Sequence, residues 1–394
     1  MALGFWSSSL LLGSLALTTS PANAVPPDTG TWSTTGAPNM GRYGHTATRL
    51  ASGMVLIAGG TTSTGSTDSF EIYDPTSRSW TISGSMQAPR KGHSATLLRD
   101  GRVLVVGGSA SPGNLAELYD PQRNSWALTG PMAVIRAEHT ATLLPNGKVL
   151  VAGGDVGFTP TASAELYDPL TGSWAATGMM VTPRVQHTAV LMDADPCGAL
   201  CGKVLVTGGE AEKSVTSSAT YDLSLTEIYD TTTGMWSSTG AMATGRSDHT
   251  ATLLLNGKVL VAGGTAGDSR AAIDTPTAEI YDPVLRTWSN TGSLASPRSS
   301  HSASPISGGR VLVAGGRNNN SESSFELQSV EIFDSATNSW AAAASLSVPR
   351  RIHSATALGS GAVLVSGGVG AAGGSSELYV EQHRRCSRVP VKCA

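Results

Sequence analysis

An arginine, an acidic residue and a histidine recur at fixed spacing in this chain and could perform acid–base chemistry. Residues 136–154 read RAEHTATLLPNGKVLVAGG and residues 246–264 read RSDHTATLLLNGKVLVAGG, so Glu138 and Asp248 each stand directly before a histidine. A positioned imidazole or carboxylate is the usual general acid or base of an enzyme. The pattern therefore indicates either a duplicated active site or a repeated scaffold.

The arginine–histidine pair occurs seven times, whereas the acidic residue occurs only twice. The histidines are His45, His93, His139, His187, His249, His301 and His353. Each follows an arginine by three places: Arg42, Arg90, Arg136, Arg184, Arg246, Arg298 and Arg350. In the other copies the residue before the histidine is Gly44, Gly92, Gln186, Ser300 or Ile352. A catalytic group needs a singular environment to tune its pKa. We therefore interpret the repeated set as scaffold and expect no catalytic residue in it.

Each unit continues with a glycine pair, a Glu-Ile/Leu-Tyr/Phe-Asp sequence and a tryptophan six residues after the aspartate. The seventh unit reads ELYV instead and ends there. A period of about fifty residues with these landmarks resembles the kelch repeat. The resemblance covers residues 30–380 and extends to secreted bacterial kelch-repeat proteins and to the superfamily of the galactose oxidase central domain.

Each unit reads as four β-strands. HTATLLPNG alternates in polarity and turns at Asn-Gly, which is a strong hairpin signal. KVLVAGG is a nearly continuous apolar strand, as expected of one buried on both faces, and AELYD and the tryptophan segment supply the third and fourth strands. A sheet with two apolar faces must stack against its neighbours. The sequence therefore predicts an all-β, seven-bladed β-propeller with four antiparallel strands in each blade.

The ends of the repeat array predict how the ring closes. Trp32 lies in a fourth-strand sequence, TGTWSTTG, that no other strand precedes, whereas the seventh unit ends at its third strand near Tyr379. We expect the N-terminal strand to complete the last blade.

Composition and targeting signals limit the class of protein. The 394 residues carry a net charge of only -3, which argues against a nucleic-acid partner. Residues 1–24 resemble a signal peptide, so we expect a secreted, periplasmic or cell-surface protein with its propeller at 25–380. No later apolar run is long enough for a membrane span. Residues 381–394 form either a basic, cysteine-containing tail or the product of a reading-frame accident.

Four cysteines form two close pairs in the sequence, Cys197 with Cys201 and Cys386 with Cys393. In an exported chain such pairs predict two small structural disulfides. Zinc binding is the alternative, but the histidines that would complete a zinc site are missing or sparse. We expect no metal site.

Function in a repeat protein should come from what differs between the blades. The loops from the glycine pair to the repeat glutamate are longest in units four to six, at 210–226, 265–278 and 317–330. Either these loops have drifted, or they form a binding surface. The expected ligand contacts on this face are Arg246, Arg270, Arg298, Arg317 and Asn318. For the seven repeated arginines, ion pairing with the repeat glutamates is the alternative that we favour.

These observations predict a non-catalytic, monomeric binding module without a cofactor, whose ligand is a protein or a polysaccharide. The alternative is a kelch-propeller enzyme resembling galactose oxidase or a sialic acid epimerase. An oxidase of that type needs tyrosines, a cysteine and two histidines converging on copper. Here no cysteine lies in a core strand, and the histidines are dispersed by symmetry.

Overall fold

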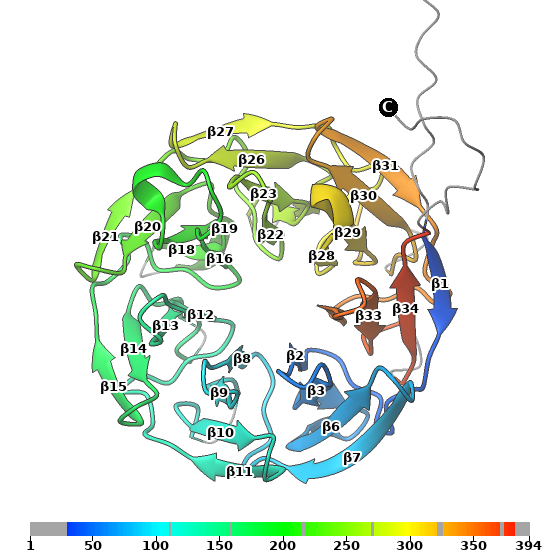
Figure 1. Cartoon of the computed structure of the whole chain (residues 1–394). Helices are drawn as coiled ribbons and strands as arrows, with labels where there is room; N and C mark the ends of the chain where they lie inside the picture. Colours follow the sequence, from blue (N-terminus) through cyan, green and yellow to red (C-terminus); the bar gives the residue numbers. More distant parts are fainter. Residues whose placement is uncertain are drawn as a thin grey trace, which may run out of the picture.

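A ring of seven four-stranded antiparallel sheets surrounds a central axis in the computed structural model (Figure 1). The structure describes residues 30–109, 112–157, 159–214, 217–268, 272–320, 326–370 and 374–382. The predicted seven-bladed propeller is confirmed. The proposed signal segment, Arg270, the pair Cys386 and Cys393, and most of the basic tail lie outside the described residues.

In each blade the first strand lies nearest the axis and the fourth lies at the outer edge of the ring. Blades 1 and 2 consist of β2 (Thr46–Arg49), β3 (Val55–Ala58), β6 (Ser69–Asp74), β7 (Ser79–Ser85), and of β8 (Ser94–Leu97), β9 (Val103–Val106), β10 (Ala116–Asp120), β11 (Ser125–Leu128). Blades 3 and 4 consist of β12 (Thr140–Leu143), β13 (Val149–Ala152), β14 (Ala164–Asp168), β15 (Ser173–Ala176), and of β16 (Thr188–Leu191), β17 (Val204–Thr207), β20 (Thr226–Asp230), β21 (Met235–Ser238). Blades 5 and 6 consist of β22 (Thr250–Leu253), β23 (Val259–Ala262), β26 (Ala278–Asp282), β27 (Thr287–Asn290), and of β28 (Ser302–Ile306), β29 (Arg310–Ala314), β30 (Val330–Asp334), β31 (Ser339–Ala343). Blade 7 consists of β32 (Ser354–Ala357), β33 (Val363–Ser366), β34 (Ser376–Val380) and β1 (Thr31–Thr34).

The hydrophobic core lies between neighbouring blades. All four residues of β13 are buried, because their side chains alternate between the two adjacent sheets. Val149 and Val151 pack with residues of blade 2, whereas Leu150 and Ala152 pack with residues of blade 4. This arrangement explains the continuous apolar runs in the sequence.

The N-terminal strand closes the ring, as predicted. β1 pairs antiparallel with β34, and Trp32 lies opposite Tyr379. The indole Nε1 of Trp32 donates a hydrogen bond of 2.7 Å to the Ala344 carbonyl in blade 6. In Figure 1 the blue β1 lies along the outer edge of the red β34. The two ends of the array therefore hold the same blade together.

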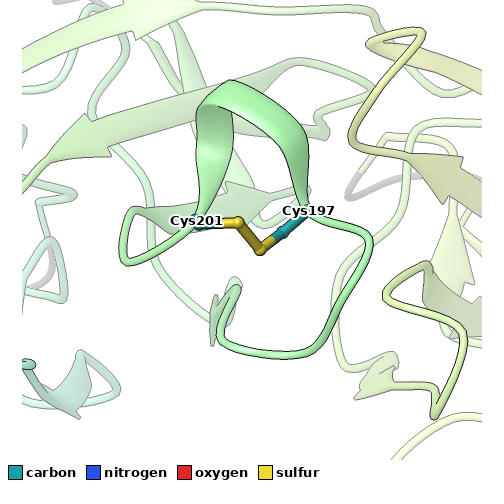
Figure 2. The surroundings of a disulfide bond; sticks show 2 residues. All are labelled: Cys197 and Cys201. Atoms are coloured by element: carbon teal, nitrogen blue, oxygen red, sulfur yellow. A yellow bond between two sulfur atoms is a disulfide. The ribbon is translucent and has the colours of Figure 1, made fainter.

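The enlarged first hairpin of blade 4 carries the predicted disulfide between Cys197 and Cys201 (Figure 2). Because this hairpin joins β16 to β17, it lies on the face opposite the long loops that follow the glycine pairs. The loop includes the 3₁₀ turn η1 (Gly198–Leu200). Cys197 and Leu200 of this loop are buried against blade 5, in a cluster that includes Tyr281, whereas Cys201 is exposed. The disulfide thus braces part of the interface between the two blades.

Three short hairpins extend the loops that follow the glycine pairs. They are β4 (Thr61–Thr62) with β5 (Gly65–Ser66), β18 (Glu210–Ser214) with β19 (Ser217–Asp222), and β24 (Thr265–Ala266) with β25 (Ile273–Asp274). A second 3₁₀ turn, η2 (Ser307–Gly309), joins β28 to β29. Within the described ranges, no helix is long and apolar enough to cross a membrane.

Candidate functional site

The seven repeated arginines are buried and form ion pairs within their own blades. Six of the Nη2–Oε1 distances lie between 2.6 and 2.9 Å. The pairs are Arg42–Glu71, Arg90–Glu117, Arg136–Glu165, Arg184–Glu227, Arg246–Glu279, Arg298–Glu331 and Arg350–Glu377. Each guanidinium also donates from Nη1 to the carbonyl of the first glycine of the doublet, as Arg246 does to Gly263 over 2.8 Å. The arginine thereby joins the segment that enters the blade to its second and third strands.

Arg246 and Arg298 therefore do not present their charges to a ligand. Both side chains have an exposed fraction of 0%, and their donors are directed at groups inside the blade. These two residues leave the set of expected ligand contacts. Arg317 and Asn318 are half-buried at the mouth, where Arg317 Nε donates to Ser299 Oγ over 2.9 Å. Ligand binding by Arg317 and Asn318 stays a prediction.

Breaking one of these pairs should be costly. Arg298→Met should lower the free energy of unfolding by about 3–5 kcal/mol, because it leaves the Glu331 carboxylate buried without its partner. Urea unfolding measures the change. The matched control is Arg123→Met, which breaks an ion pair with Asp120 in which the arginine side chain is 77% exposed, and which should cost less than about 1 kcal/mol. Equal losses in the two variants would contradict a structural role for the buried pair.

The seven histidines form a ring that links the innermost strands of adjacent blades. Each Nε2 lies 2.8–3.1 Å from a serine or threonine hydroxyl on the first strand of the preceding blade. Burial and the nearby arginine lower the pKa of His139 to about 3, so the imidazole is neutral at neutral pH. A Cβ at Gly153 would lie 2.6 Å from His187 Cε1, which explains why glycine occupies the end of the second strand. Each repeated histidine therefore links two neighbouring blades.

The residue before each histidine lines a pocket of about 410 Å³ at one mouth of the central channel. All seven of these residues adopt left-handed φ angles between 50° and 64°, a conformation that is unfavourable for most side chains other than glycine. Five backbone hydrogen bonds join them from blade to blade, including Glu138 N to Gly92 O over 2.8 Å and Gly44 N to Ile352 O over 3.1 Å. We name this set the channel ring: Gly44, Gly92, Glu138, Gln186, Asp248, Ser300 and Ile352.

Sequence reasoning set the channel ring aside because its residue types differ between copies. The backbone is the same in every blade, but the side chains that reach the pocket are not. A variable position between two repeated ones is the signal that identifies such a ring. The structure therefore adds Glu138 and Asp248 to the candidate site, because both residues line the pocket.

The three long loops contact one another in sequence order. Blade 4 meets blade 5 where Asp222 N donates to Gly267 O over 3.0 Å. Blade 5 meets blade 6 at Asp274, whose carboxylate accepts the Asn319 N–H over 2.6 Å and whose carbonyl accepts the Asn320 amide over 2.7 Å. The described parts of these loops thus form a continuous wall on the side of the mouth that the sequence predicted.

Four carboxylates lie around this side of the mouth. Burial and the Asp248 carboxylate raise the pKa of both Glu138 and Glu210. Burial, Glu210 and Asp248 raise the pKa of Asp222 to about 7, although a hydrogen bond with Ser247 opposes the shift. The pKa of Asp248 is itself raised by burial, and Arg317 partly offsets that shift. The four carboxylates therefore lie close enough to interact electrostatically. We name them the acidic cluster: Glu138, Glu210, Asp222 and Asp248.

A hollow of about 850 Å³ lies on the opposite face between blades 1 and 2. Here Phe70 occupies the register held by alanine in blades 2, 3 and 5, and the pairing of β6 with β7 shifts beside it. Its ring lies 5.6 Å from that of Trp126, whose Nε1 is buried without an acceptor. Tyr119 bonds to Asn124 instead of to the preceding blade.

The ring, its closure and its repeated ion pairs define a seven-bladed propeller of kelch type. The KLHDC2/KLHL20/DRC7 Kelch-repeats domain model matches residues 138–368, which are more than half of the chain, and the Kelch motif model matches residues 42–87. The chain belongs to the kelch-repeat family.

Two similar proteins illustrate how far the likeness extends. An F-box/kelch-repeat protein of Arabidopsis thaliana is 33% identical over 112 residues, which are 28% of this chain and 28% of that protein. The chain thus matches less than a third of that relative's length. A fungal alcohol oxidase of the AA5 family, solved in complex with copper, has a TM-score of 0.69 at 18% identity, covering 90% of this chain and 76% of its own. At that identity the likeness shows the fold alone.

A copper oxidase would need side chains that converge on one metal ion. Among them, one group of three histidine, cysteine or acidic side chains lies close enough to share a metal ion: Asp195, Cys197 and Cys201. Both sulfur atoms of that group are in the disulfide, so they are not thiolate ligands. The histidines point their Nε2 atoms at hydroxyl groups and do not converge.

Proposed function

We propose that the protein is an exported, non-catalytic binding module that holds a protein or polysaccharide ligand at the mouth formed by the channel ring and the loops of blades 4–6. The observation that carries the proposal is the wall of three consecutive, interlocked loops beside a pocket lined by variable residues. The repeated polar residues are engaged in internal bonds and have little left to offer a ligand.

The wall supports binding because it is held in place before any ligand arrives. Asp274 is 1% exposed and fixes the Asn319–Asn320 turn through backbone and amide hydrogen bonds. A site positioned by a rigid scaffold loses less conformational entropy when a ligand binds. Arg317 and Asn318 lie at the start of the third loop, where their donors and acceptors can reach a polar ligand.

Shortening the loops tests which face binds. The variant replaces 210–226, 265–278 and 317–330 by loops of the eight-residue length found in blades 2 and 7. On peptide and glycan arrays, we expect it to lose the ligands that the parent protein captures. In the core strands the replacement changes only the first residue of β20, β26 and β30, so the circular dichroism spectrum should stay that of the parent.

The control changes the opposite face. Cys197→Ser combined with Cys201→Ser removes the disulfide beneath blade 4 and should keep every captured ligand. If the control loses binding and the shortened variant keeps it, the binding site lies on the face of the disulfide and not on the face of the long loops.

The compartment and domain limits belong to the same proposal. We propose that residues 1–24 are removed as a signal peptide, that 25–380 form the working propeller, and that 381–394 are a tail. Mass spectrometry of the secreted protein should give a mature N-terminus near Val25. Elemental analysis of the same sample addresses the enzyme alternative, because stoichiometric copper would favour an oxidase over a binding module.

A further inference from the structure

We propose that the hollow between blades 1 and 2 binds a primary ammonium group on an apolar stem, supplied by a lysine side chain or by a free alkylamine. The hollow lies on the face opposite the mouth, so this inference goes beyond the proposed function and does not depend on it. Its volume of about 850 Å³ is typical of pockets that hold small ligands. The Asp74 carboxylate and the apolar side chains of Leu50, Met54 and Ile72 are part of its lining.

Three other blades show how a carboxylate at the position of Asp74 holds an ammonium group. In each, the aspartate that ends the third strand accepts the Nζ of a lysine at the end of the first hairpin, and the Nζ–Oδ2 distance is 2.8–3.1 Å. The other carboxylate oxygen accepts a backbone N–H of the following turn. The pairs are Lys148–Asp168, Lys203–Asp230 and Lys258–Asp282. The repeat therefore has an ammonium site at this register.

Blade 1 has the aspartate but not the lysine. Met54 directly precedes β3 and occupies the position of these lysines, because β3 pairs with β6 in the register that the other blades share. Asp74 Oδ1 accepts the Thr76 N–H over 2.8 Å, as its counterparts do in their turns. Hydrogen bonds from Thr76 and Ser77 lower the pKa of Asp74, so its carboxylate is charged at neutral pH. Within the described part of the chain, no lysine, arginine or histidine forms an ion pair with this carboxylate.

The other charged side chains in the lining neutralise one another. Arg102 has the position of the lysines in blade 2, but it donates to Asp100 over 2.7 and 2.8 Å. Arg123 forms an ion pair with Asp120. Three further arginines on this face of blades 1 and 2 do not line the hollow: Arg49, Arg78 and Arg99. The charge of Asp74 therefore remains uncompensated in the lining.

The junction between blades 1 and 2 leaves room for a ligand beside Asp74. At four other junctions a threonine hydroxyl lies 2.6–2.8 Å from the tyrosine hydroxyl of the next blade. Here Asn124 lies between the two blades, accepting from Tyr119 over 2.8 Å and donating to the Ser83 carbonyl over 3.5 Å. Met54 is 39% exposed beside this opening. An alkyl stem that covers Met54 removes apolar surface from water while its ammonium group reaches the carboxylate.

Saturation-transfer NMR titrations test the ligand class. The probes are Nα-acetyl-lysine amide, n-pentylamine and Nα-acetyl-norleucine amide, which has the alkyl stem without the ammonium group. We expect both amines to bind with a Kd of about 1–10 mM, since one ion pair and a short stem supply little free energy. The norleucine derivative should bind about fivefold more weakly, the factor that a single partly exposed ion pair contributes. Binding this weak is not retained on arrays, so the experiment is independent of the test of the mouth.

Two variants of blade 1 remove the site in different ways. Asp74→Asn removes the charge, keeps an acceptor for the Thr76 N–H, and should weaken binding of both amines about fivefold. Met54→Lys supplies the ammonium group from the chain itself, as blades 3–5 do, and should abolish amine binding. Met54→Leu is its control and should change the affinity by less than about twofold, because the side chain stays apolar. Asp168→Asn is the control for charge: it alters a carboxylate that Lys148 already occupies, and its effect should also stay below about twofold.

The other outcomes each have a defined meaning. Equal affinity for the lysine and norleucine derivatives would refute the ammonium site. Equal weakening by Asp74→Asn and Asp168→Asn would refute it as well, because the net charge of the protein would then attract the amines. Unchanged binding in both Asp74→Asn and Met54→Lys would place the amines elsewhere on the protein. Binding of n-pentylamine without the lysine derivative would support the site and assign it to a free amine.

Discussion

Deletion of residues 25–38 is expected to lower the free energy of unfolding by at least about 5 kcal/mol, because it removes the half-buried Trp32 together with the pairing of a whole strand. The deletion removes β1, its pairing with β34 and the indole hydrogen bond from Trp32 to the Ala344 carbonyl. It also removes the contact between Trp32 and Tyr379, whose ring centroids are 5.2 Å apart. The third strand of blade 7 would become an unpaired sheet edge.

Urea and thermal unfolding measure this loss, and two point variants separate its parts. Trp32→Phe should lower stability more than Trp126→Phe, because only the first indole N–H has an acceptor. The difference should be about 1 kcal/mol, the usual net value of one hydrogen bond. An unchanged melting temperature after the deletion would contradict the view that β1 closes the ring.

The closed ring could be predicted because each of its parts recurs in the sequence. A fourth-strand segment around Trp32 without earlier strands, and a last unit that ends near Tyr379, leave one pairing that completes every blade. The buried ion pairs followed in the same way, because arginine and glutamate recur together. Because the strand and turn sequences recur in seven units, one unit that departs from the pattern does not change the predicted fold.

The candidate site was harder to predict because it depends on what the repeat does not fix. Sequence spacing located the three long loops, but their mutual bonds at Asp222 and Asp274 join residues of different blades. The sequence also gave no sign that Asp248 would influence Glu138 and Glu210 at once. Such electrostatic coupling follows from the radius of the ring, which brings one register of every blade to the same pocket.

The repeated arginines could either contact a ligand or form ion pairs inside the blade, and their burial shows that they form ion pairs. A guanidinium at the mouth would attract anions, whereas a guanidinium within the blade requires a carboxylate. The sequence supplies glutamates for the second meaning but does not show which way the side chain turns. Arg246 and Arg298 turn inward, so their charges are neutralised within the blade.

Acidification should unfold the propeller over a narrow range of pH, because of the histidine ring. Burial lowers the pKa of His45, His93, His139, His301 and His353 to about 3. It also holds the pKa of His187 and His249 well below the ordinary value of 6.5. The unfolded chain therefore binds protons first as the pH falls below about 6.5, and stability that is present above that pH is lost.

The expected effect is large because all seven residues act in the same direction. One pH unit below its unfolded pKa, each histidine costs about 1.4 kcal/mol, so the ring costs about 10 kcal/mol near pH 5.5. That is comparable with the whole stability of a typical domain, about 5–15 kcal/mol. The Asp222 carboxyl group has the opposite effect on stability. Because its pKa is raised to about 7, the folded state gains stability as the pH falls through that value. The raised pKa values of Glu138, Glu210 and Asp248 act in the same direction as that of Asp222, but four carboxyl groups do not offset seven imidazoles.

Urea titrations at about pH 7.5, 6.5 and 5.5 measure the dependence, and its slope gives the number of protons taken up on unfolding. His301→Gln should reduce that slope by about one proton, because the amide can still donate to Thr250 but cannot titrate. Asp222→Asn should instead raise stability above about pH 7, where the native carboxylate is charged and poorly solvated. Equal midpoints at the highest and lowest pH would mean that the imidazoles accept protons without leaving their places between the blades, and that the ring is not the acid-labile element of the fold.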